Sequence, residues 1–105
     1  MEGDFDMPEQ VSAGELADRV LAHPSVVRLH GGQFGEIASY LPGRKVVGVR
    51  LPESGAAEIG VVLRLDRPLP EVLGEIRDAL AEALGDVPVD ITVADVITGE
   101  PRGGA

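Results

Sequence analysis

The segment that decides the fold covers residues 58–85 and reads EIGVVLRLDRPLPEVLGEIRDALAEALG. Apolar side chains alternate along its first part, which predicts a β-strand over residues 58–66 with one face buried. Pro70 suits the first position of a helix, and Gly85 suits the position just after its end. Between these two residues apolar side chains recur at helical spacing, so the segment predicts a strand followed by a long amphipathic helix.

A second helix is predicted near the start of the chain. Ser12 and Glu15 have the spacing of a capping box, and Pro24 ends the helix that follows. A chain of 105 residues is expected to form one domain. The expected organisation is a flexible acidic arm over residues 1–10, a single domain over 11–97 and a flexible tail over 98–105.

Three further strands complete the predicted fold. Apolar alternation indicates strands over residues 25–30, 46–51 and 89–96, and residues 36–41 are expected to make a short helical turn. The order is then α-β-β-β-α-β. It predicts an α+β fold, a two-layer α/β sandwich in which both helices cover one face of a mostly antiparallel sheet.

Composition excludes several classes of function. The chain has no cysteine, which removes disulfides and thiolate chemistry, and its net charge is −9 with 3% aromatic residues. An acidic chain with few aromatic side chains is a poor match for nucleic acid, so no nucleic-acid partner is expected. There is no long apolar run and no basic leader at the N-terminus, which predicts a cytoplasmic location.

No set of residues has the pattern of a catalytic or metal site. His23 and His30 are the histidines of the chain, and their spacing matches no usual ligand motif. The serines lack the surroundings of an activated nucleophile, and the acidic residues of the long helix indicate a solvated face. We therefore expect no enzyme activity, no catalytic residue, no metal and no cofactor.

The strand pattern places basic residues on the sheet face away from the helices. Arg28, Arg50 and Arg64 all fall at these outward positions, and His30 follows on the same side. They are candidate partner-binding residues if the strands are neighbours. Alternatively, they are exposed charges that nearby acidic residues neutralise, namely Glu58, Asp66 and Asp90. Apolar residues at outward positions suggest that a partner or a second copy covers this face: Val46, Val62, Ala94 and Val96.

A glycine-rich turn follows the first strand. Gly31, Gly32 and Gly35 form the pattern Gly-Gly-x-x-Gly, which could cradle an anion if a helix began directly after it. The pattern is neither a dinucleotide-binding fingerprint nor a phosphate-binding loop. The alternative is a turn that needs positive φ angles.

The central segment resembles a known family. Residues 26–51, VVRLHGGQFGEIASYLPGRKVVGVRL, are similar to the alkaline shock protein family, the general-stress and envelope-stress proteins of Gram-positive bacteria. The similarity covers roughly residues 12–96, and its most specific parts are LHGGQFGEIASYLPGR at residues 29–44 and PLPEVLGEI at residues 68–76.

The resemblance implies a small cytoplasmic α/β protein without catalytic residues, which acts as a scaffold. Some members of the family are held near the membrane by an anchoring partner, and some self-associate. This chain shows no basic or amphipathic tail, so direct membrane insertion is not expected. The expected function is protein–protein contact, with a membrane-anchored partner or in a homo-oligomer. The alternative is a regulatory domain that binds a small ligand or anion at the Gly31, Gly32 and Gly35 turn.

Overall fold

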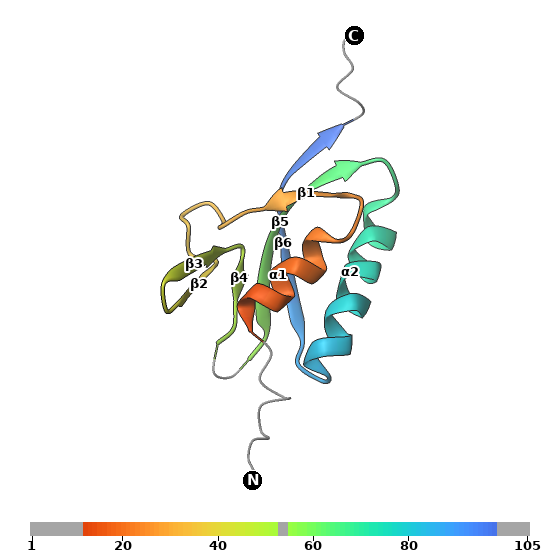
Figure 1. Cartoon of the computed structure of the whole chain (residues 1–105). Helices are drawn as coiled ribbons and strands as arrows, with labels where there is room; N and C mark the ends of the chain where they lie inside the picture. Colours follow the sequence, from red (N-terminus) through yellow and green to blue (C-terminus); the bar gives the residue numbers. More distant parts are fainter. Residues whose placement is uncertain (1–11, 53–54, 99–105) are drawn as a thin grey trace.

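A computed structural model describes residues 12–52 and 55–98 of the chain (Figure 1). Its elements in chain order are α1 (Ala13–Leu21), β1 (Val26–Leu29), β2 (Ala38–Leu41), β3 (Arg44–Val47), β4 (Val49–Arg50), β5 (Ala57–Leu65), α2 (Leu69–Leu84) and β6 (Val89–Thr98). The predicted arm and residues 99–105 of the predicted tail lie outside the described residues. Thr98, which was expected to belong to the tail, is the last residue of β6.

The main sheet is built around β5, which pairs with three other strands. β6 runs parallel to β5 along its whole length, from Ala57 to Leu65. β1 and β4 are antiparallel to β5 and share its other edge, with β1 against its C-terminal half and β4 against its N-terminal half. A parallel pair needs a crossover connection, and α2 supplies it between β5 and β6.

Both helices pack on one face of this sheet, as Figure 1 shows. Each helix buries one stripe: Leu16 and Val20 from α1 and Ile76 and Leu80 from α2 belong to the same apolar core. The core side of β5 supplies Ile59, Val61 and Leu63. The predicted α+β architecture, with two helices against a mostly antiparallel sheet, is therefore confirmed. Neither helix in the described part of the chain is long and apolar enough to cross a membrane.

The segment between β1 and β5 differs from its prediction. The expected helical turn at residues 36–41 is wrong, because Ala38–Leu41 form strand β2, which pairs with β3 in a separate hairpin. The predicted strand over residues 46–51 is broken at Gly48, whose φ of 94° is outside the β region. Five strands rather than three therefore precede α2.

Two β-bulges change which side chains face the core. The register of β1 shifts between Val26 and Arg28, and that of β6 shifts opposite the Val61/Val62 step, so Val27 and Ala94 are the extra residues. Val26 consequently lies opposite Leu63 and is buried in the core, although regular alternation with the outward Arg28, two residues later, would put it on the outer face. Val96 also lies opposite Leu63, so the prediction that it faces outward is wrong. Val46 is likewise a core residue.

The outer face of the sheet is partly covered. Val62 points outward from β5 between core-facing neighbours, yet it is fully buried. Ile37, in the loop before β2, is also buried, and its Cδ1 atom lies against Gly60, two residues before Val62. The loop between β1 and β2 therefore covers the outer face around Gly60.

Candidate functional site

Both aromatic side chains in the described ranges are exposed to solvent. Phe34, in the loop before β2, is 83% exposed, and Tyr40, in β2, is 74% exposed. Val47, two residues after Lys45 on the same face of β3, is 43% exposed. Transfer of a large apolar side chain from water to a buried site is favourable by about 1.5–3 kcal/mol. Contact of these exposed side chains with another molecule would therefore contribute favourable binding free energy. We name as the hairpin surface Tyr40, Lys45 and Val47 of the β2–β3 hairpin together with Phe34 of the loop that leads into it.

The β2–β3 hairpin presents this surface because its other face is attached to the body of the protein. Tyr40 lies directly opposite Lys45, whose Nζ is 5.4 Å from the centre of the tyrosine ring. On the opposite face Val46 is buried in the core, and the Ser39 hydroxyl donates a 2.6 Å hydrogen bond to the Val49 carbonyl. The hairpin is thereby fixed on one side and open to solvent on the other.

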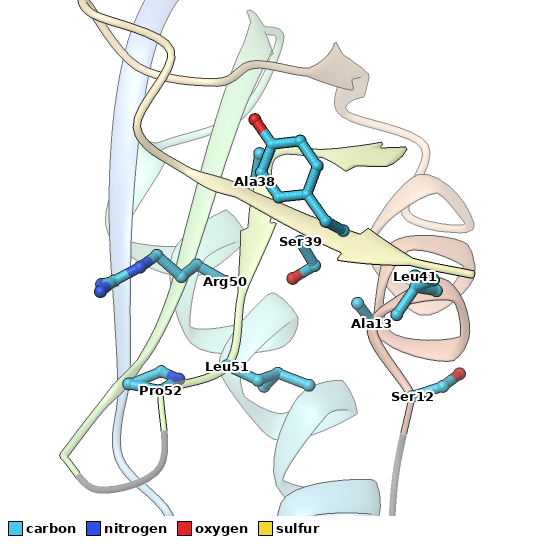
Figure 2. Close-up of a pocket in the computed structure, with 9 residues that line it drawn as sticks. Ser12, Ala13, Ala38, Ser39, Leu41, Arg50, Leu51 and Pro52 are labelled. Atoms are coloured by element: carbon cyan, nitrogen blue, oxygen red, sulfur yellow. The ribbon is translucent and has the colours of Figure 1, made fainter. Parts of the chain in front are cut away.

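An open groove of about 490 Å³ lies between the start of α1, strand β2 and the end of β4 (Figure 2). Three of its polar side chains, those of Ser12, Ser39 and Arg50, are already engaged. The Ser12 hydroxyl accepts from the Glu15 amide, the Ser39 hydroxyl donates to the backbone, and the Arg50 side chain extends away from the groove. The groove could therefore accommodate a ligand by its shape, but these side chains supply no reactive group to it. Its lining consists of Ser12, Ala13, Ala38, Ser39, Tyr40, Leu41, Arg50, Leu51 and Pro52.

The three predicted arginines lie on the outer face but do not form a continuous stripe. Arg50 lies opposite Glu58 and makes a 2.9 Å ion pair with it, which fits the alternative of local neutralisation. Arg64 donates to the Pro24 carbonyl at 3.3 Å. Arg28, on β1, is exposed at the position opposite Val62. Arg64, on β5, and Arg28, on the neighbouring β1, thus lie near one end of the sheet. The ion pair of Arg50 and Glu58 lies nearer the other end.

The Gly-Gly-x-x-Gly segment forms a turn that requires glycine. Gly32 and Gly35 have φ angles of 90° and 74°, a region that L side chains rarely adopt. The Gly35 amide donates to the Gly32 carbonyl, and the Gly31 carbonyl accepts from the Ile37 amide. No helix begins after the turn, since strand β2 follows it.

Two further backbone donors of this turn are engaged by side chains of the same loop. The Gly32 amide donates to Nδ1 of His30 at 2.9 Å, and the Phe34 amide donates to the Glu36 carboxylate at 3.0 Å. The same carboxylate lies against the Cα of Gly32. A negative charge of the chain thus occupies the place where an external anion would have to bind, which gives the anion-binding alternative no support.

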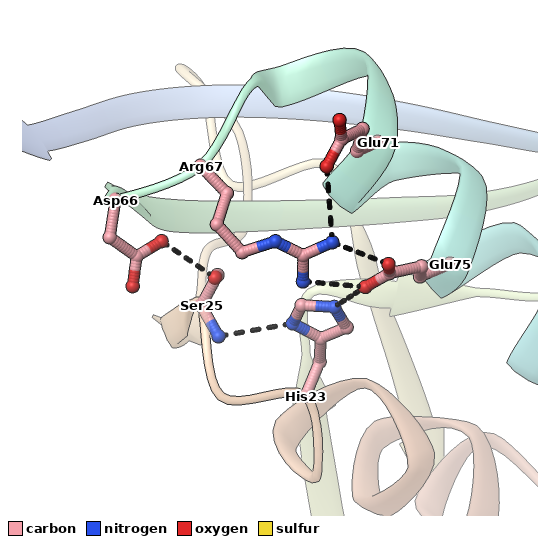
Figure 3. Close-up of polar contacts among 6 residues, drawn as sticks. All are labelled: His23, Ser25, Asp66, Arg67, Glu71 and Glu75. Carbon is pink, nitrogen blue, oxygen red and sulfur yellow. Dashed lines mark hydrogen bonds and ion pairs between the residues drawn. The ribbon is translucent and has the colours of Figure 1, made fainter.

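Sequence reasoning missed a polar cluster that joins α1 to α2 (Figure 3). Glu75, in α2, is its centre. Its carboxylate accepts from the Arg67 guanidinium and, at 2.8 Å, from Nε2 of His23 after the end of α1. Arg67 also contacts Glu71 at 3.3 Å. The Arg67 hydrogen bonds, followed by that from His23, lower the pKa of Glu75 to about 2.

This cluster contains serine, histidine and acidic residues but is not a catalytic triad. Nδ1 of His23 accepts from the backbone amide of Ser25, not from its hydroxyl. The Ser25 hydroxyl donates to Asp66 at 2.8 Å, and the residue is 1% exposed. A nucleophile must reach its substrate and contact its base. Ser25 does neither, so the cluster is a structural clamp between the helices.

The clamp predicts a pH-dependent contribution to stability. The pKa of Glu75 is lowered from 4.5 to about 2 in the folded protein, so its contribution is complete above pH 4.5 and is lost as pH falls toward 2. Glu75→Gln should therefore be less stable than the wild type at pH 7, by a modest amount because the pair is at the surface. Urea unfolding at pH 7, 4.5, 3 and 2 should show this difference shrinking as pH falls.

Asp78→Asn is the matched control, because Asp78 is an exposed acidic residue on the same helix. Its stability relative to the wild type should not follow the pH course of Glu75→Gln. A Glu75→Gln difference that stays constant from pH 7 to 2 would contradict the assignment of the clamp.

Comparison with known proteins adds no assignment. Scans of protein-family models, curated proteins and solved structures found no match. Within residues 12–52 and 55–98, no group of three or more histidine, cysteine, aspartate or glutamate residues is arranged to hold a metal ion.

The hairpin surface was missed because the segment was interpreted as a turn. Once Ala38–Leu41 is read as a strand, alternation alone places Tyr40 on the face opposite Ser39 and Leu41. The signal was therefore present in the sequence. The clamp had no comparable signal, because its residues come from two stretches, residues 23–25 and 66–75, that are distant in the sequence and meet only in the folded protein.

Proposed function

We propose that this protein is a non-enzymatic cytoplasmic scaffold or interaction protein, which acts by contact with another protein or with copies of itself. The observation that carries the proposal is the exposed hairpin surface of Phe34, Tyr40, Lys45 and Val47. The resemblance of residues 26–51 to envelope-stress proteins supports a partner that is itself anchored to the membrane. In that case the chain is membrane-peripheral through its partner.

The composition of the hairpin surface supports a protein partner. Tyrosine is enriched among the residues that dominate binding energy at interfaces, and an aromatic side chain loses little entropy when it is fixed. Lys45 adds positive charge to this surface in a protein whose net charge is −9. The hairpin surface is therefore suited to a partner with an apolar contact area and neutral or acidic surroundings.

The double substitution Phe34→Ser and Tyr40→Ser tests the proposal. Both side chains are exposed, so the free energy of unfolding should change by no more than about 0.5 kcal/mol. Loss of two interface aromatic residues should weaken partner binding by about 10-fold or more. The measurement is quantitative affinity purification from the native host, together with sedimentation equilibrium of the purified protein to detect self-association.

Leu21→Ser is the matched control, because Leu21 is a 47% exposed apolar residue at the end of α1, far along the chain from the hairpin. Proteins retained by the wild type and by Leu21→Ser but lost from the double variant would be partners of the hairpin surface. Equal retention by all three proteins, with no self-association that depends on Phe34 and Tyr40, would refute the proposal.

A further inference from the structure

Strand β6 has one edge that no other strand pairs with in the described part of the chain, and we call it the open edge. Among the described residues it pairs with β5 alone, over all of Val89–Thr98. In a parallel pair, about half of the N–H and C=O groups of the outer strand point away from its partner. β6 therefore presents a row of backbone donors and acceptors, with half-buried Ile91 and Val93 on its helix side. Side chains engage two of its backbone groups, since the Val89 carbonyl accepts from Arg77 and the Val96 amide donates to the Asp95 carboxylate.

The side chains along this edge carry negative charge on the outer face. Asp90 lies opposite Glu58, and Asp95 lies opposite Val62, so both aspartates project on the side away from the helices. Both are exposed, and β6 contains no basic residue. Glu58 is neutralised by Arg50 on the far side of β5. Asp90 and Asp95 are therefore the charges that β6 itself carries, while Arg77 of α2 reaches only its first residue, through the Val89 carbonyl at 3.4 Å.

This charge pattern disfavours a second copy of the chain as the occupant of the edge. Addition of β6 to β6 would place aspartates of the two copies on the same face of one continuous sheet, and like charges at adjacent strand positions are destabilising. Each copy also carries a net charge of −9. The bulge at Ala94 further interrupts the regular edge that self-pairing needs.

We infer that β6 is a docking edge for an extended segment of a partner protein that carries alternating basic and apolar residues. The partner segment adds as a further strand, with its apolar side chains beside Ile91 and Val93 and its basic side chains beside Asp90 and Asp95. The two aspartates lie opposite Glu58 and Val62, which are four residues apart on β5. The partner's basic residues are therefore four positions apart.

The probe is a fluorescent peptide with the sequence Lys-Val-Thr-Val-Lys-Val-Thr-Val-Lys, titrated against the full chain by anisotropy. We expect saturable binding that weakens at least 10-fold in the double variant Asp90→Lys and Asp95→Lys. The corresponding peptide with glutamate at each lysine position should bind that variant and not the wild type. Hydrogen exchange should show that the lysine peptide slows exchange of backbone amides in residues 89–98.

Asp78→Lys with Asp86→Lys is the matched control, because it makes the same change of charge at exposed positions outside β6. It should retain binding of the lysine peptide within about 3-fold, since screening at physiological salt limits the effect of distant charges. A peptide with N-methylated valines should not bind, because it cannot complete the backbone pairing.

Three results would overturn the inference. They are no binding at millimolar peptide, binding that both double variants weaken equally, and a wild-type dimer whose β6 amides are protected without peptide. The inference does not depend on the hairpin surface, since that surface adjoins β4 at the other edge of β5. Phe34→Ser with Tyr40→Ser should leave peptide binding unchanged, so failure of one proposal is distinguishable from failure of the other.

Discussion

Replacement of Gly60 with alanine is expected to cost about 4 kcal/mol or more and to leave little folded protein, because backbone overlap in a packed interior is among the most damaging changes. A Cβ atom at this position would overlap the His30 carbonyl oxygen, which belongs to the backbone and has no side chain to rotate. Relief of the overlap would push the end of β1 away from β5 and break the backbone hydrogen bond from the His30 amide to the Gly60 carbonyl.

Thermal unfolding followed by circular dichroism measures this effect, and Gly74→Ala is its control. Gly74 lies inside α2, and an added Cβ would meet no atom within 4 Å. Alanine should therefore stabilise the helix by about 0.5–1 kcal/mol. The two substitutions are chemically identical and should act in opposite directions. A Gly60→Ala protein with the wild-type melting temperature would show that the backbones of Gly60 and His30 do not approach each other closely.

Ile37→Ala should cost about 2–5 kcal/mol, although the residue lies in a loop. Its side chain is 4% exposed and covers the outer face of the sheet beside Gly60. Alanine would leave a cavity there and expose the fully buried Val62. Urea denaturation gives the free energy directly, with Val47→Ala as a control that should change stability by no more than about 0.5 kcal/mol, as at other exposed sites. Equal effects of the two substitutions would mean that the loop does not cover the sheet.

The parts of the fold that were predicted correctly are those with long periodic signals. The apolar stripe of α2 and the alternation in β5 extend over many residues, so chance interruptions do not obscure them. Ser12 caps α1 through the Glu15 amide, as the capping-box spacing predicted. Gly85 follows α2 with a φ of 70°, as its position after the last apolar residue predicted.

The errors occur where one residue interrupts a strand or reverses the inward and outward alternation of the side chains beside it. Gly48 divides one predicted strand into β3 and β4, and the bulges at Val27 and Ala94 reverse the alternation on either side of them. No local pattern marks a bulge, because it is stabilised by the pairing of strands that are distant in the sequence. The inward orientation of Val26 and Val96 could not be derived for this reason.

The outward direction of the three arginines was predicted from alternation, but their partners were not. Asp66, one of the residues expected to neutralise them, binds the Ser25 hydroxyl. Asp90 faces Glu58 rather than an arginine. The register between strands determines these contacts, and register depends on turns and bulges that the sequence signals only weakly.

The parallel pairing of β5 with β6 has a consequence for biosynthesis. β5 is the strand that all other strands of the main sheet contact, and half of its edge pairing comes from the last element of the described chain. A ribosome-bound chain that ends after α2 therefore has an open edge on its most apolar strand. Chaperone binding to nascent chains should accordingly persist until β6 emerges, and then decline.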